Sequence, residues 1–254
     1  MERLRLVYDA QKDSGAAPRD AIAAAEQDLV VMFTDLVGFS RIAAMTGSRA
    51  AGALLSRALG EQIEIVESSG GVVRNIMGDG IMASWTIARE NERAAIAARA
   101  VRAAFAIASA MERHPSPLPG QRGLAVRVGL HVGPALFGTI AEGHAAGRTL
   151  IGDTVNIAAK LEQARRSRAG AESLGAVRVS EELYGELSPV QQALLPFRAA
   201  IRAAGRRLQL RSSFGSGLEM TRRSLSIGAA AAPYAFPMGW DRCLDRLAEV
   251  VEAA

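Results

Sequence analysis

The chain has a single cysteine, Cys243, and only two lysines, Lys12 and Lys160. One cysteine cannot form an internal disulfide, and no N-terminal stretch has the layout of a signal peptide, so we expect a cytoplasmic protein. A P-loop nucleotide hydrolase is excluded, because the sequence contains no GxxxxGK[ST] motif. The formal net charge of +4 is weak support for nucleic-acid binding, and we expect no nucleic-acid partner.

The most apolar helical stretch, residues 94–111, carries Arg99 and Arg102 near its middle, which is costly for a membrane span. We therefore expect a core helix there and no membrane span. At 254 residues, with 49% hydrophobic and 22% charged residues, the chain is long enough to bury a full core, as one large domain or a domain with an appendage.

Apolar runs and turn residues predict the element order strand, helix, strand, strand, helix, strand. The predicted strands are 29–34, 71–77, 81–85 and 125–132, and the predicted helices are 48–68 and 91–112. The strand 125–132 alternates apolar and polar residues, which predicts a half-buried strand. This order is the split βαββαβ arrangement of ferredoxin-like α+β domains, in which the first strand lies antiparallel beside the strand that leaves the hairpin.

Two aspartates lie at ends that this topology brings together. Asp35 follows the first apolar run, and Asp79 lies in a Gly-Asp-Gly hairpin turn. Carboxylate oxygens are the ligands that hard divalent ions prefer, so the pair predicts a metal site. Taken singly, each aspartate has a simpler interpretation: Asp79 supplies turn chemistry, and Asp35 caps the following helix.

A second polar pair follows the last of these strands. After a further strand-like run at 135–140 and a glycine-rich excursion, the segment TLIGDTVNIAAKLEQA predicts a short strand, a turn and a helix from about Thr154. Asn156 and Lys160 are four residues apart and project from one face of that helix. They could bind a phosphate or ribose, or form an ordinary solvated face.

Four motifs occur in an order and at intervals that resemble the class III nucleotidyl cyclase catalytic domain: FTDLVGFS, IMGDGIMASW, VRVGLHVGP and TLIGDTVNIAAKLE. The resemblance runs from about residue 28 to residue 187. It implies the same α+β ferredoxin-like core, extended by C-terminal β/α elements. We therefore expect a lead-in at 1–28, a cyclase catalytic domain at 29–212, and a C-terminal extension at 213–254.

The resemblance also implies an activity. Such domains are lyases that convert a nucleoside triphosphate to its 3′,5′-cyclic monophosphate and pyrophosphate. Asp35 and Asp79 match the ligands of two Mg²⁺ or Mn²⁺ ions. Asn156 and Lys160 match the family's transition-state asparagine and arginine, although lysine lacks the planar arginine fork. The family builds its sites in a dimer, so we expect a homodimer in which the aspartates of one subunit face the helix of the other.

The residues at the base-binding positions depart from the family pattern. Adenylyl cyclases commonly have a lysine where this chain has Asn75, and an aspartate or threonine where it has Thr149. Arg74 is adjacent to Asn75, but neighbours on a strand point to opposite faces unless the strand is bulged. Thr149 resembles a bacterial adenylyl subset, so ATP is the expected substrate. GTP or a pyrimidine nucleotide is the alternative.

One further interpretation remains open, and another is disfavoured. A degenerate cyclase domain could bind a nucleotide or a partner without turnover, which the substitutions at Asn75 and Lys160 would suit. A polymerase or nuclease palm would also use paired aspartates, but it would leave the GDTVNIAAK helix without a role. The family's late triphosphate lysine has no counterpart beyond Lys160, and Arg206 or Arg207 could replace it.

Overall fold

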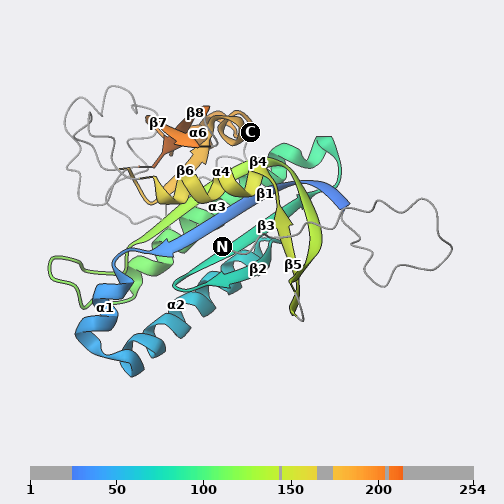
Figure 1. Cartoon of the computed structure of the whole chain (residues 1–254). Helices are drawn as coiled ribbons and strands as arrows, with labels where there is room; N and C mark the ends of the chain where they lie inside the picture. Colours follow the sequence, from blue (N-terminus) through green and yellow to red (C-terminus); the bar gives the residue numbers. More distant parts are fainter. Residues whose placement is uncertain (1–24, 143–144, 165–173, 204–205, 214–254) are drawn as a thin grey trace, which may run out of the picture.

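The computed structural model describes residues 25–142, 145–164, 174–203 and 206–213 (Figure 1). Most of the predicted lead-in and almost all of the predicted C-terminal extension lie outside these residues.

The described residues form one mixed sheet with helices on both faces. The strands are β1 (Ala25–Leu36), β2 (Val72–Met77), β3 (Gly80–Ile87), β4 (Val126–Glu142), β5 (Ala145–Ile151), β6 (Val177–Ser180), β7 (Phe197–Ala203) and β8 (Arg206–Ser212). The helices are α1 (Phe39–Thr46), α2 (Ser48–Ser68), the 3₁₀ turn η1 (Glu90–Glu92), α3 (Arg93–Arg113), α4 (Asp153–Gln163), α5 (Glu181–Gly185) and α6 (Pro189–Gln192).

The strand order confirms the predicted core. The sheet runs β2-β3-β1-β4-β6-β8-β7, and β5 pairs with the far end of β4. β1 lies antiparallel to both β3 and β4, as the ferredoxin-like arrangement requires. Strands β5 to β8 and helices α4 to α6 are the additional C-terminal elements.

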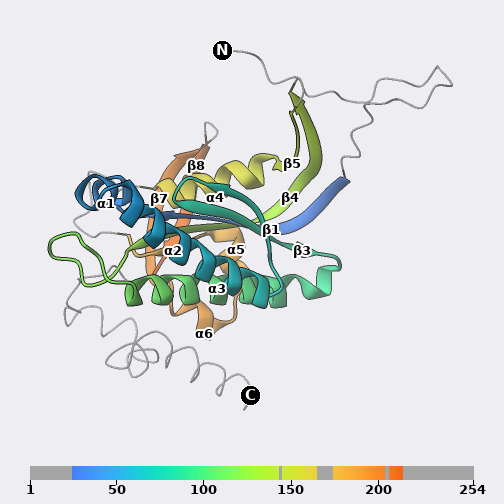
Figure 2. The same cartoon turned by 90° about the horizontal axis from the view of Figure 1, so that it is seen from below.

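Two layers of helix cover the sheet. Figure 2 shows α2 and α3 on one side of the sheet and α4 on the other. The larger apolar cluster packs between the sheet and the α2/α3 layer, and it includes Trp85 and Phe105. A smaller cluster, with Leu29 and Met82, packs under α4. By length and apolar composition the helical stretch Glu90–Arg113 could cross a membrane, but two thirds of its most apolar window is buried inside the fold.

The structure differs from the sequence predictions in four respects. β1 begins at Ala25 rather than at residue 29, and a separate helix, α1, precedes α2. β4 continues through Pro134 as one strand. β4 is also buried on both faces rather than on one, because α4 packs closely over it: a methyl group at Gly129 would overlap the backbone of α4. His131, on the side predicted to be exposed, is only 6% exposed.

A buried polar chain fastens the end of β1 to the start of β3. The Ile81 amide donates to Thr34 Oγ1 at 3.0 Å, and that hydroxyl donates to Gln62 Oε1 at 2.7 Å. Gln62 is fully buried in α2, and its Nε2 lies 3.6 Å from Met111 Sδ. Because buried polar groups are costly when unpaired, this chain fixes the hairpin, the strand end and α2 in one arrangement.

Gly80 is the point of closest approach between the hairpin and β1. A methyl group there would overlap the Thr34 carbonyl and come 3.2 Å from the Asp35 Cα atom. Only a residue without a side chain lets the two backbones meet at this distance.

We expect Gly80→Ala to lower the free energy of unfolding by roughly 3 kcal/mol, the upper part of the range for overpacking, because the backbone must shift. Gly60→Ala is the matched control, since Gly60 lies in α2 with open space around it. That change should stabilise by about 0.5–1 kcal/mol. Urea denaturation of both variants measures the difference, and equal stabilities would contradict this account of the hairpin.

Candidate active site

Asp35 and Asp79 lie together at one edge of the fold. Asp35 is near the end of β1, and Asp79 occupies the β2–β3 turn, where Gly78 adopts a left-handed φ of 64°. Burial and the neighbouring negative charge of Asp35 raise the pKa of Asp79. The topology argument from the sequence thus holds: two carboxylates separated by the whole of α2 share one site.

The donor set fits a divalent metal of the magnesium type. Two carboxylates repel each other when both are ionised, and a bound cation removes that repulsion. Magnesium is usually held by one or two carboxylates together with substrate phosphates, rather than by a cage of protein ligands. Accordingly, within the described part of the chain no group of three or more His, Cys, Asp and Glu residues forms a metal cage.

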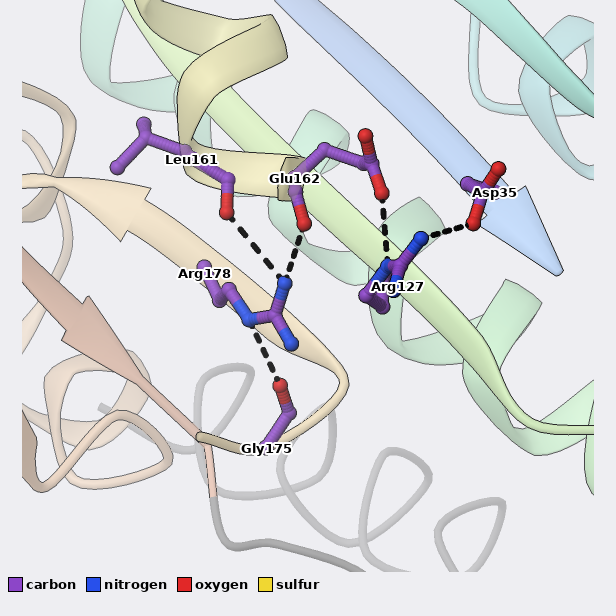
Figure 3. A network of polar contacts seen from close by, with 6 residues as sticks. All are labelled: Asp35, Arg127, Leu161, Glu162, Gly175 and Arg178. Carbon is purple, nitrogen blue, oxygen red and sulfur yellow. Dashed lines mark hydrogen bonds and ion pairs between the residues drawn. The ribbon is translucent and has the colours of Figure 1, made fainter. Parts of the chain in front are cut away.

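Arg127 connects Asp35 to helix α4. Asp35 and Arg127 are cross-strand partners on β1 and β4, and Arg127 Nη2 donates to Asp35 Oδ2 (Figure 3). Its Nε donates to Glu162 Oε1 at 2.9 Å. Burial by itself would lower the pKa of Arg127, but the hydrogen bonds and charges of Glu162 and Asp35 raise it above its usual value. Arg127 therefore stays charged and orients the Asp35 carboxylate.

Arg178 supports the same network from below α4. Its guanidinium donates to the carbonyl oxygens of Leu161, Glu162 and Gly175 (Figure 3). Burial and the like charge of Arg127 lower the pKa of Arg178 to about 10. Glu162 is also buried, which raises its pKa even though Arg127 pairs with it. The C-terminus of α4 is thus held by a buried cation that satisfies carbonyls the helix leaves unpaired.

Helix α4 presents Asn156 and Lys160 on its exposed side. Its buried side includes Ile157, Ala158 and Leu161. Within the described residues, no hydrogen bond or ion pair joins Asn156 or Lys160 to the two aspartates. Helix α4 is linked to Asp35 at its C-terminal end, through the contact of Arg127 with Glu162.

The predicted base-binding residues lie on strands that approach each other. Asn75 is on β2, opposite Met82 of β3, and Thr149 is on β5, opposite Gly138 of β4. β2 and β5 come within 8 Å of each other between Cα atoms. The register of β2 shifts between Val73 and Asn75, so the strand is bulged at Arg74.

Sequence reasoning did not identify the residues that support the aspartates, namely Thr34, Gln62, Arg127, Glu162 and Arg178. The alternation of β4 placed Arg127 on its polar side, but the partner of Arg127 depends on strand register. Gln62 had no signal, since it lies in an otherwise ordinary amphipathic helix. Of these residues, Arg178 is the one that could have been suspected of a supporting role, and that only once β6 was known to be fully buried.

We expect Arg127→Gln to destabilise the fold in a pH-dependent way. Losing the positive charge should raise the pKa of Glu162 further. An acid whose folded pKa exceeds its unfolded value stabilises the fold when protonated, and that contribution is lost as the pH rises through the folded pKa. The loss of unfolding free energy should be about 2 kcal/mol at pH 8 and much smaller near pH 4.5. Arg102→Gln, exposed on α3, is the control. Chemical denaturation across pH tests this, and a pH-independent loss would contradict it.

Comparisons with known proteins identify the family and the fold. The profile of the adenylate and guanylate cyclase catalytic domain matches residues 22–206. A curated relative, adenylate cyclase 1 of Rhizobium meliloti (strain 1021), is 31% identical over 145 residues, which are 55% of this chain and 21% of the relative. The chain thus spans about a fifth of the length of that relative.

Solved structures share the fold. The adenylyl cyclase CyaB from P. aeruginosa superposes with a TM-score of 0.61 at 23% identity, over 78% of this chain and 97% of that one. A dimeric guanylyl cyclase domain of the RhoGC fusion protein from the aquatic fungus Blastocladiella emersonii superposes with a TM-score of 0.56 at 20% identity, over 75% and 98%. From its motifs, its topology and the family profile, the chain belongs to the family of adenylate and guanylate cyclase catalytic domains.

Proposed function

We propose that the protein converts a nucleoside triphosphate, with ATP as the preferred substrate, to its 3′,5′-cyclic monophosphate and pyrophosphate at a homodimer interface in the cytoplasm. The proposal rests on one observation: Asp35 and Asp79 lie close together at the end of β1, and Arg127 holds Asp35 in place through a hydrogen bond.

The reaction needs little covalent chemistry from the protein. The ribose 3′ oxygen attacks the α-phosphorus and its proton passes to water, while the bond between the α-phosphorus and the oxygen that bridges to the β-phosphate breaks and pyrophosphate leaves. Positioning and charge stabilisation supply most of the catalysis in phosphoryl transfer. The side chains described next would supply both the positioning and the charge stabilisation.

Asp35 and Asp79 would hold two Mg²⁺ or Mn²⁺ ions. When bound, these ions lower the cost of charge that develops on the attacking oxygen and the phosphates. Arg127 orients Asp35 through the hydrogen bond between them. Asn156 can hydrogen-bond the ribose or phosphate, and Lys160 stabilises phosphate charge as a point cation. Asn75 and Thr149 would contact the base.

Two features support a homodimer. One is an exposed apolar surface on β2, and the other is that no hydrogen bond or ion pair among the described residues joins Asn156 or Lys160 to the two aspartates. β2 exposes three large apolar side chains: Val72 at 49%, Ile76 at 53% and Met77 at 40%. Such exposure on one short strand is typical of an interaction surface. A partner subunit seated near β2 would bring the Asn156 and Lys160 of its own α4 towards Asp35 and Asp79.

ATP ranks first among the substrates on two grounds. Thr149 resembles the bacterial adenylyl subset, and the curated relative is named an adenylate cyclase. The second candidate function is a degenerate domain that binds nucleotide without turnover, which Lys160 favours because it replaces the planar arginine fork. The persistence of both aspartates in one site opposes it.

Incubation with Mn²⁺ and each of ATP, GTP, CTP and UTP should yield a cyclic nucleotide and pyrophosphate from at least one of them. EDTA should abolish turnover, and Asp35→Asn or Asp79→Asn should lower kcat/KM by at least about a hundredfold, because several kcal/mol of charge stabilisation is lost. Glu64→Gln, exposed on α2, is the control for removal of an acidic group. Absence of product with all four nucleotides would refute the enzyme and favour the binding module.

Mixing two inactive variants tests the shared site. Asp35→Ala and Asn156→Ala subunits in equal amounts should recover about a quarter of wild-type activity, because half the dimers are mixed and each mixed dimer has one intact site of two. Mixing Asp35→Ala with Asp79→Ala is the control and should recover nothing, since both damage the same half-site. Equal recovery in the two mixtures, or none in the first, would rule out the proposed interface.

A further inference from the structure

The bulge in β2 gives Arg74 an unexpected position. Val73 is opposite Ala83 and Asn75 is opposite Met82, so Arg74 is the extra residue between two consecutive pairs. In a regular strand Arg74 would point away from Asn75, but an inserted residue breaks the alternation.

Contacts show which face Arg74 occupies. Its Nε donates to Ser84 Oγ at 2.8 Å, and its guanidinium carbon lies 4.8 Å from the centre of the Phe137 ring. Phe137 packs against the cluster under α4, and that cluster includes Met82, the partner of Asn75. Arg74 and Asn75 therefore lie on the same side of the sheet, the α4 side.

This side of β2 is next to the strand that carries Thr149. Phe137 is paired with Leu150 of β5, the residue after Thr149, and β2 and β5 approach within 8 Å between Cα atoms. The guanidinium thus lies over Phe137 of β4, whose partner on β5 is the residue after Thr149. The bond to Ser84 and the contact with the ring fix its plane, so little conformational entropy remains to be lost on binding.

We propose that Arg74 is a specificity-determining residue that donates hydrogen bonds to acceptor atoms on the edge of the nucleobase. This inference rests on the proposed function, since it refers to the same nucleotide site. A guanidinium has only donors, so it matches neighbouring acceptors such as O6 and N7 of guanine better than the acceptor-donor edge of adenine. Arg74 therefore reduces the advantage of ATP that Thr149 supports and moves the base preference towards bases that are rich in acceptors, while Thr149 and Asn75 contribute groups of either kind.

Binding of non-cyclisable 3′-deoxynucleoside triphosphates tests this without turnover. With Mn²⁺ present, the analogues of all four nucleotides are titrated calorimetrically into Arg74→Ala. The analogue that the wild type binds most tightly should bind about ten- to hundredfold more weakly, and the four affinities should differ less from one another. In Arg74→Gln the ratio of adenine to guanine affinity should rise about tenfold over wild type, because the glutamine amide pairs with both the acceptor and the donor of adenine. Arg89→Ala, with a side chain 77% exposed before η1, should change neither.

A purely structural role for Arg74 gives a different result. It would lower the melting temperature and weaken all four nucleotides equally, with the adenine-to-guanine ratio unchanged, and that outcome overturns the proposal. Ser84→Ala removes the anchor but leaves the arginine, so it should move the ratio in the same direction as Arg74→Gln but less.

The outcome also separates this inference from the proposed function. Cyclic product from the wild type, together with unchanged base ratios in Arg74→Gln, would keep the cyclase and refute the role of Arg74. Shifted ratios without any cyclic product would keep Arg74 as a base-reading residue in a binding module. Failure of the wild type to bind any of the four nucleotides would refute both.

Discussion

The structure depends on the contact between the β2–β3 hairpin and the end of β1. Gly80 allows the backbone of the hairpin to reach the Thr34 carbonyl, and the Thr34 hydroxyl joins the amide of Ile81 to Gln62 in α2. Two aspartates far apart in the sequence share a site because these backbones cannot separate without leaving buried polar groups unpaired. The metal half of the proposed centre is therefore a property of the core rather than of a flexible loop.

A second network links that half to α4. Arg127 contacts Asp35 on one side and Glu162 on the other, and Arg178 holds the end of the helix by its carbonyl oxygens. Removing Arg127 costs more than its pairs contribute, because the charge of Glu162, which is buried, stays desolvated. In a dimer with shared sites, Asp35 and α4 of one chain would serve different sites. The network would then connect those two sites through a single subunit.

The order of elements and the identity of the polar pairs could be predicted well from the sequence. Apolar periodicity and the Gly-Asp-Gly turn predicted the hairpin, and the motif spacing predicted where Asp35, Asp79, Asn156 and Lys160 would lie. These features are local, since they depend on period, turn chemistry and neighbours along the chain. The burial of His131 was predicted wrongly, because alternation along β4 gives no information about how closely α4 packs against it.

Local pattern by itself determined that this chain has a βαββαβ core, a pair of carboxylates at two ends that meet, and a helix with an amide and a cation on one face. Tertiary structure alone decided which cation orients Asp35, because that depends on the register of β1 with β4. It also decided that Arg74 and Asn75 share a face, because the bulge depends on how β2 pairs with β3 rather than on the residues of β2 alone. Register and bulges are long-range properties, which a linear sequence does not specify.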